Sequence, residues 1–179
     1  MEMEMMLREL EREGHKRAVP ICGPVKGMFL EILANIREPK HILELGTAIG
    51  YSTLILAIAA PQARIITVDS SREWQEEAED NLERAGVKNV EFVKGDAIEY
   101  LKSSKEEFDF IFLDIQKSEY IKALPHCIER LSKGGVLAAD NALWEEVEGY
   151  NKACGKDGRL LHVVVPLEDG MAVSLKKWG

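Results

Sequence analysis

The chain has 179 residues, 46% hydrophobic and 30% charged, with a formal net charge of -8 and an isoelectric point near 5.1. This length and composition predict one folded domain over residues 21–179, preceded by a polar helical segment over residues 1–20. The acidic balance disfavours a non-specific nucleic-acid binder. The lack of an apolar run of about 20 residues excludes a membrane span. Three scattered cysteines and an acidic N-terminal stretch predict a reduced, cytoplasmic protein.

Seven short segments rich in Ile, Val and Phe are predicted as strands, because their length and β-branched content are typical of strands. In chain order they cover residues 41–45, 64–69, 90–96, 108–114, 135–140, 160–167 and 171–177. Segments with helical periodicity lie between most of them. Strands that alternate with helices in this way predict βαβ units.

Two of the intervening helices have a clear apolar stripe. In residues 70–86 the stripe consists of Trp74, Ala78, Leu82 and Ala85. Ser70 with Glu73 fits a capping box at the start of this helix, and Gly86 marks its end. In residues 118–135 the predicted stripe consists of Ile121, Leu124, Ile128 and Leu131. Gly134 and Gly135 are predicted to end this second helix, and Pro125 to kink it.

These elements predict an α/β fold: a mostly parallel, seven-stranded sheet with helices on both faces. The last two strands are separated only by a short turn at residues 168–170, so the last strand must be antiparallel. In an open sheet of this kind, a ligand binds beyond the carboxyl ends of the strands.

Five predicted strands end on an acid or an acid-containing turn. These ends carry Glu44 with Gly46, Asp69, Gly95 with Asp96, Asp114, and Asp140 with Asn141. A single strand-terminal Asp is often only a helix N-cap. Five such ends on one rim of a sheet predict a binding site.

The stretch HILELGTAIGYST, residues 41–53, indicates which ligand that site takes. Its glycines, Gly46 and Gly50, follow the spacing G-x-x-x-G and not the G-x-G-x-x-G that a dinucleotide pyrophosphate requires. Glu44 would repel a pyrophosphate but attract an ammonium or sulfonium group. Asp69, at the end of the second strand, is placed to accept hydrogen bonds from ribose hydroxyls. A nucleoside with a positive charge is implied, and S-adenosylmethionine fits.

Several motifs, in this order and spacing, resemble the class I, cation-dependent O-methyltransferases, the group that includes catechol and caffeoyl-CoA O-methyltransferases. They are ICGPVKGMFLEIL, ILELGTAIGYST, TVD, VKGDAIEYL, FDFIFLDIQKSEY, LSKGGVLAADNALW and VVVPLEDGMAVSLKK. The resemblance implies a Rossmann-like methyltransferase fold that binds S-adenosylmethionine. The residues it assigns to this cofactor are Cys22, Glu44, Gly46, Thr47, Gly50, Tyr51, Ser52, Asp69, Ser70, Gly95, Asp96, Ala97 and Asp114.

Asp114, Asp140 and Asn141 would supply three oxygen ligands at the ends of two strands, a set that suits Mg²⁺. Two N-caps and a turn Asn are the alternative interpretation. In the family, these positions hold a divalent cation, which would chelate vicinal hydroxyls of the acceptor and lower the pKa of one. Lys117 resembles the family lysine that takes the hydroxyl proton, so Lys117 and Asp114 are the expected catalytic residues.

The sequence departs from the family pattern in an abbreviated N-terminal segment and at two places near the expected site. Gln116 stands where the family commonly has a second acid, which weakens any cofactor contact carried over there. After Trp144, the short acidic segment EEVEGYNKACGKDG replaces a longer acceptor loop, so we expect an open acceptor pocket with Trp144 as a wall.

We therefore expect an S-adenosylmethionine-dependent, metal-assisted O-methyltransferase that acts on a small catechol-like or vicinal-diol acceptor. We also expect a homodimer, as relatives commonly form, with pairing through the apolar residues of the N-terminal segment. One alternative is a tRNA methyltransferase of the same fold that acts on a hydroxylated uridine. Others are a non-catalytic nucleoside-binding protein and a nicotinamide dehydrogenase.

Overall fold

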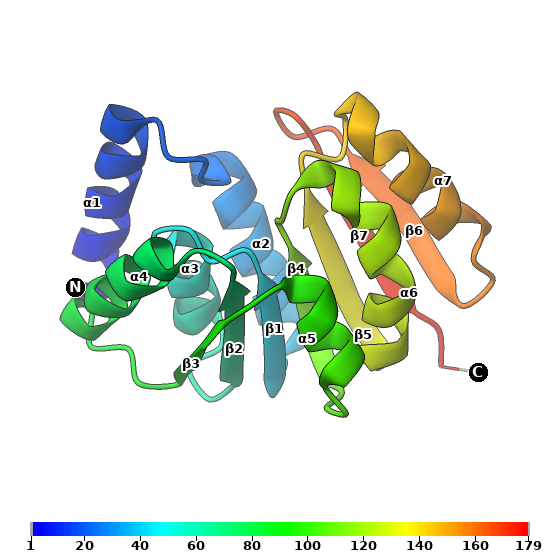
Figure 1. The fold of residues 1–179 in the computed structure, drawn as a ribbon, viewed down its shortest axis with the longest axis horizontal. Coiled ribbons are helices and arrows are strands. Elements are labelled where there is room, and N and C mark those ends of the chain that lie inside the picture. Colours follow the sequence, from blue (N-terminus) through cyan, green and yellow to red (C-terminus); the bar gives the residue numbers. More distant parts are fainter. Residues whose placement is uncertain (1, 179) are drawn as a thin grey trace.

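The computed structural model describes residues 2–178, which form one seven-stranded sheet flanked by helices (Figure 1). The strand order is β3-β2-β1-β4-β5-β7-β6, and only β7 runs antiparallel to its neighbours. The strands are β1 (His41–Leu45), β2 (Arg64–Asp69), β3 (Val90–Lys94), β4 (Phe108–Leu113), β5 (Leu131–Asp140), β6 (Leu160–Val165) and β7 (Met171–Lys176). The predicted fold class, with its antiparallel last strand, is confirmed.

Helices cover both faces of the sheet (Figure 1). They are α1 (Glu2–Arg17), α2 (Gly23–Arg37), α3 (Tyr51–Ala59), α4 (Arg72–Arg84), α5 (Ala97–Ser103), α6 (Tyr120–Arg130) and α7 (Glu148–Lys156), with short 3-10 helices η1 (Lys117–Glu119) and η2 (Glu145–Val147). None of the helices in residues 2–178 combines the length and apolar character of a membrane span.

The alternation of side chains along the strands divides the core into two layers. Ile42 and Phe110 point toward α1–α4, whereas their neighbours Leu43 and Ile111 point toward α5–α7. Almost every side chain of β1 and β4 is buried, Glu44 included, so these strands carry apolar side chains on both faces.

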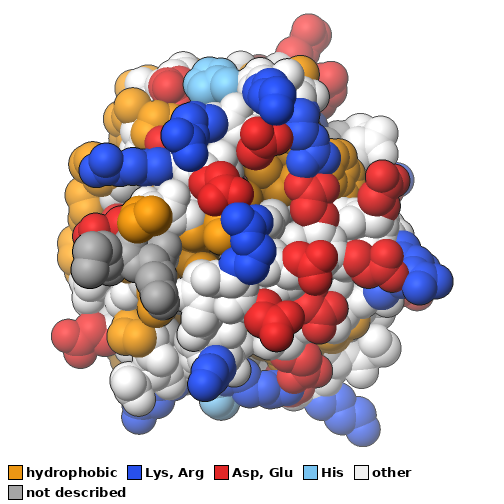
Figure 2. All heavy atoms as spheres, turned by 90° about the vertical axis from the view of Figure 1, so that its left-hand side faces the viewer, with side chains coloured by type: hydrophobic (Ala, Val, Ile, Leu, Met, Phe, Trp, Pro, Cys, Tyr) orange, Lys and Arg blue, Asp and Glu red, His pale blue; other side chains and the backbone are white. Residues whose placement is uncertain are grey.

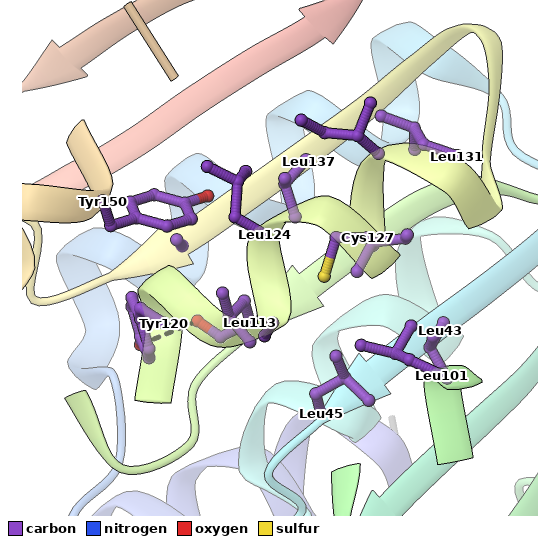
Figure 3. Packing of buried hydrophobic residues seen from close by; sticks show 14 of the residues in the cluster. Leu43, Leu45, Leu101, Leu113, Tyr120, Leu124, Cys127, Leu131, Leu137 and Tyr150 are labelled. Atoms are coloured by element: carbon purple, nitrogen blue, oxygen red, sulfur yellow. Dashed lines mark hydrogen bonds between the residues drawn. The ribbon is translucent and has the colours of Figure 1, made fainter. Parts of the chain in front are cut away.

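The layer under α5–α7 fixes the segment that follows β4 (Figure 3). The hydroxyl of Tyr120 donates to the carbonyl oxygen of Leu113 at 2.9 Å, and its ring meets that of Tyr150 edge-on with centroids 5.5 Å apart. Both tyrosines are fully buried. The start of α6 is therefore tied to the end of β4, which holds the intervening residues 114–119 at the rim of the sheet.

Helix α1 occupies most of the predicted N-terminal segment and packs on the same core. Its residues Met6 and Leu10 are buried in the layer that contains α3. The hydroxyl of Tyr51, at the start of α3, donates to Glu11 at 2.7 Å. Contacts of both kinds, apolar and polar, hold α1 beside the turn that follows β1.

Several predicted details of the two striped helices are wrong. Ser71, and not Ser70, caps α4, because its hydroxyl oxygen accepts the backbone N–H of Trp74 at 3.2 Å. In α6, Ile121 is exposed and the buried stripe contains Tyr120, Ala123, Leu124, Cys127 and Ile128. Strand β5 begins at Leu131, directly after α6, so the two glycines expected to end the helix lie inside the strand.

The turn from β1 into α3 requires glycine at Gly50 because of packing between helices. Gly50 has a φ of 84°, and a Cβ atom there would lie 2.7 Å from Cδ1 of Leu82 in α4. The side-chain amide of Asn81, also in α4, donates to the carbonyl oxygen of Ile49 at 3.1 Å. Bare backbone at Gly50 therefore lets α4 approach the turn.

We predict that Gly50→Ala lowers the free energy of unfolding by about 2–4 kcal/mol, because it adds left-handed backbone strain to a clash with Leu82. Chemical denaturation measures the change. Gly149→Ala in α7 is the control, since a Cβ there meets no atom within 4 Å. Equal stability of Gly50→Ala and the wild type would contradict this account of the turn.

Candidate functional site

A cavity of about 430 Å³ opens at the carboxyl ends of β1, β2 and β4. It contains most of the residues predicted to bind the cofactor. Those that line it are Cys22, Gly46, Thr47, Tyr51, Ser52, Asp69, Ser70, Gly95, Asp96, Ala97 and Asp114. The predicted residues that do not line it are Glu44 and Gly50. We call this space the cofactor cavity.

Asp69 organises the floor of the cofactor cavity. Its Oδ2 atom accepts the backbone N–H groups of Thr47 and Ala48 at 3.0 and 3.1 Å, and its Oδ1 atom accepts that of Ser71 at 2.9 Å. One carboxylate thus joins the turn after β1 to the start of α4. Oδ1 accepts only one hydrogen bond and keeps a further lone pair, which leaves acceptor capacity for a hydroxyl in the cavity.

Gly46 lies in the turn that follows β1, at the point where this turn crosses the end of β4. Its φ is 101°, and a Cβ atom would lie 2.1 Å from the carbonyl oxygen of Asp114. The glycine therefore permits contact between the two strand ends. On the opposite wall, Asp96 caps α5, because its Oδ1 atom accepts the backbone N–H of Glu99 at 2.9 Å.

Glu44 lies behind the cavity wall and not on its surface. The side chain is fully buried, and hydroxyl groups of Ser52 and Thr67 donate to it at 2.6 Å. The hydroxyl of Thr53 donates to it as well. These three hydroxyls take the place that the sequence analysis gave to a ligand cation. Glu44 instead holds Ser52, which does line the cavity.

A second cavity of about 640 Å³ adjoins the first, and we call it the acceptor cavity. Its wall includes Asp140, Asn141 and Trp144, and the indole of Trp144 is about half exposed, at 46%. Asp114 and Lys117 line both cavities. The two cavities therefore adjoin at these two residues, and Pro20, Ile21, Ile115 and Gln116 also line both.

Lys117 is held firmly at this junction. Its Nζ atom donates to Oδ1 of Asp114 at 2.5 Å and to the carbonyl oxygen of Ile115 at 3.1 Å. The same atom lies 5.2 Å from the ring centroid of Tyr120 and 6.0 Å from that of Trp144. Lys117 thus faces an aromatic wall from a fixed position.

The three predicted metal ligands, Asp114, Asp140 and Asn141, all line the acceptor cavity, but the arrangement does not fit a divalent cation. Lys26, in the first turn of α2, places its Nζ atom 2.5 Å from Oδ1 of Asp140. Asp114 is paired with Lys117, and the amide nitrogen of Asn141 donates to Asp169. Within residues 2–178, no cluster of three or more His, Cys, Asp or Glu side chains could hold a metal ion.

Lys26 and Asp169 are functional candidates that the sequence analysis did not single out. Lys26 lies in the motif that follows Cys22, and Asp169 lies in the turn between β6 and β7. Both motifs were matched to the family, but neither residue was given a role. The sequence did contain a signal for Lys26, because this lysine stands among apolar residues at helical spacing, a pattern that predicts a charged side chain on the buried face of the helix.

The comparisons with known proteins identify the family. The sequence model of the O-methyltransferase family matches residues 1–177. The chain belongs to the O-methyltransferase family. This O-methyltransferase is 36% identical to a catechol O-methyltransferase of Niastella koreensis over 87% of its own length and 81% of the relative's. It is 30% identical to caffeoyl-CoA O-methyltransferase 1 of Eucalyptus globulus over 93% of its own length and 78% of the relative's.

Solved structures show the same fold. The O-methyltransferase of Bacillus cereus, solved in complex with SAH, superposes with a TM-score of 0.88 at 24% identity, over 97% of this chain and 91% of the other. An O-methyltransferase of Streptomyces achromogenes superposes with a TM-score of 0.85 at 24% identity, over 96% of this chain and 89% of the other.

Burial raises the pKa of Glu44 from 4.5 to about 7, which outweighs the lowering by its three hydroxyl donors. The folded state then binds the proton more tightly than the unfolded chain, so stability falls as the pH rises from about 4.5 through about 7. The loss amounts to roughly 3 kcal/mol. We predict that Glu44→Gln, which has no proton to lose, removes this part of the pH dependence.

Urea denaturation of both proteins at about pH 5 and about pH 8 checks the prediction. Glu79→Gln, on the exposed surface of α4, is the control and should keep the pH dependence of the wild type. The explanation fails if Glu44→Gln loses as much stability between the two pH values as the wild type does.

Proposed function

We propose that this O-methyltransferase transfers a methyl group from S-adenosylmethionine to a hydroxyl of a small catechol-like or vicinal-diol acceptor. The observation that carries the proposal is the junction of two cavities at Asp114 and Lys117. A methyl donor and a methyl acceptor in separate cavities would meet there, and such alignment supplies most of the rate of a simple displacement.

The cofactor cavity supports S-adenosylmethionine as the donor. Asp69 has acceptor capacity for a ribose hydroxyl at Oδ1, and Asp96 with Ala97 forms the far wall, where the adenine would lie. The methionine end would lie along Gly46, Tyr51 and Ser52, nearest to the acceptor cavity. The Bacillus cereus relative, which has the same fold, was solved with SAH.

In the transfer step, the acceptor oxygen attacks the methyl carbon, the O–C bond forms, and the S–C bond breaks to leave S-adenosylhomocysteine. Lys117 receives the hydroxyl proton at its Nζ atom, and Asp114 fixes the position of that atom. We assign no step to a divalent cation, because the amino groups of Lys26 and Lys117 already bind Oδ1 of Asp140 and Oδ1 of Asp114.

Trp144 supports an aromatic acceptor. Its half-exposed indole forms one wall of the acceptor cavity, and a flat ring could stack on it. A hydroxyl of that ring would then lie toward Lys117, whose Nζ atom is 6.0 Å from the indole centroid. The catechol O-methyltransferase of Niastella koreensis, a relative at 36% identity, is named for an acceptor of this class.

A hydroxylated uridine in tRNA stays the alternative acceptor. Figure 2 shows the side of the molecule where α1 and α4 lie, and acidic side chains are interspersed there among the Lys and Arg. Ion pairs such as Arg17–Glu77 and Arg84–Glu9 neutralise part of the basic charge on this side. A mixed surface of this kind gives little attraction for phosphates on this side of the molecule, and the net charge of -8 also favours the small acceptor.

We predict that labelled S-adenosylmethionine transfers its methyl group to at least one member of a catechol panel, and that Lys117→Ala lowers kcat by about 10²–10⁴-fold with cofactor affinity retained. Scintillation counting measures transfer, and calorimetry measures affinity. The control is Lys122→Ala, an exposed lysine of α6 with the same charge. Transfer only to tRNA would support the alternative, and unchanged kcat in Lys117→Ala would remove the proposed role of Lys117.

We also propose a homodimer, formed through α2. Its outer face carries exposed apolar residues with the spacing i, i+3, i+7 and i+11, namely Val25, Met28, Ile32 and Ile36. A continuous apolar stripe of this kind is uncommon on a free surface, and it is self-complementary when a second copy packs across it about a two-fold axis. The stripe lies on α2, whereas the sequence analysis expected pairing through the N-terminal segment.

Light scattering coupled to size-exclusion chromatography is expected to give the mass of a dimer for the wild type and of a monomer for Ile32→Glu, which buries a charge in the stripe. Glu31→Gln, a neighbour on the same helix, is the control and should stay dimeric. A monomeric wild type at high concentration would refute the dimer.

A further inference from the structure

Lys26 belongs to α2, and its buried ammonium group lies beside Asp140 at the end of β5. Its side chain is only 4% exposed, and its Nζ atom lies 2.5 Å from Oδ1 of Asp140 and 2.5 Å from Oδ1 of Asp169. Asp140 is equally buried, at 3% of its side-chain surface. A buried carboxylate without a counter-charge is strongly destabilising, so Lys26 balances charge that would otherwise have no partner.

The two hydrogen-bond donors at Oδ1 of Asp140 leave no room for a metal on that oxygen. Oδ1 accepts both the Lys26 ammonium and the backbone N–H of Asn141, the latter at 2.7 Å. Mg²⁺ binds carboxylate oxygens at roughly 2.0–2.1 Å in strict octahedral geometry. A divalent ion on this oxygen would crowd against the ammonium, with which it shares the sign of its charge.

The neighbouring groups are turned toward Lys26 as well. Asp169 accepts from Lys26 through Oδ1 and from the side-chain amide of Asn141 through Oδ2. Asn141 adopts a left-handed backbone with a φ of 52° and lines the acceptor cavity together with Asp140 and Asp169. The lysine thus fixes the acids that form one wall of the acceptor cavity.

We propose that the ammonium of Lys26 is a built-in substitute for a divalent cation, so that the wild-type protein binds no such ion at Asp140 and Asp169. Lys26 acts as a positioning residue, because it reaches the acceptor cavity through Asp140, Asp169 and Asn141. A corollary, which rests on the proposed function, is that methyl transfer does not require a divalent metal.

Binding of Mn²⁺ to the full chain tests the proposal without any acceptor. We expect the wild type to leave the electron paramagnetic resonance signal of free Mn²⁺ unchanged. Lys26→Ala, which frees both carboxylates, is expected to bind one Mn²⁺ at least tenfold more tightly than the wild type. Asp140→Asn added to Lys26→Ala should abolish this site. Lys122→Ala, the matched exposed lysine, should behave as the wild type does.

Thermal unfolding with and without Mn²⁺ is the second measurement. Mn²⁺ should raise the Tm of Lys26→Ala by several degrees and leave that of the wild type unchanged, since only a site that binds the ion is stabilised by it. The proposal is overturned if the wild type binds Mn²⁺ and Asp140→Asn removes that binding, or if folded Lys26→Ala binds none. The wild-type measurement decides even if Lys26→Ala does not fold.

The corollary is tested with any acceptor that the catechol panel provides. We expect the initial rate of the wild type to stay within twofold in excess EDTA, and a rate that chelation abolishes would overturn the corollary. Absence of transfer to every acceptor would count against the proposed function alone, because Mn²⁺ binding is measured without an acceptor.

Discussion

The buried carboxylate of Glu44 connects the three elements on which the cofactor cavity depends. It lies in β1 and accepts hydroxyl hydrogen bonds from Ser52 and Thr53 in α3 and from Thr67 in β2. The backbone turn between β1 and α3 is thereby anchored at both ends. Asp69 then binds the N–H groups of that same turn from the next strand. One buried acid thus supports a second acid that faces the ligand.

The sequence was sufficient to predict the sheet. Its buried strands are short segments rich in β-branched residues, which differ clearly from the amphipathic helices between them. The sequence also placed the strand-end acids at one rim, since the carboxyl ends of parallel strands must share it, and the resemblance to the family implied the other residues around the cofactor cavity. It could not show that Gly50 serves the contact with Leu82, or that Glu44 is enclosed by hydroxyls. Both depend on residues far apart in the chain.

The sequence predicted which acidic and amide side chains line the acceptor cavity, but not which cations pair with them. Asp114, Asp140 and Asn141 do converge, as expected from strand ends. The lysine that pairs with Asp140 comes from α2, 114 positions earlier in the chain, and no local pattern indicates its partner. Oxygen ligands alone therefore do not identify a metal site, because an ammonium group satisfies the same carboxylates at a lower charge.

The wall shared by the two cavities has a thermodynamic consequence. Asp114 and Lys117 contribute surface to both, so a ligand that changes their positions in one cavity changes the shape and charge of the other. Linkage then requires that each ligand alter the affinity for its counterpart by the same factor. The pair that joins the cavities would thus also couple their occupancies, with methyl donor and methyl acceptor each acting as an effector of the other.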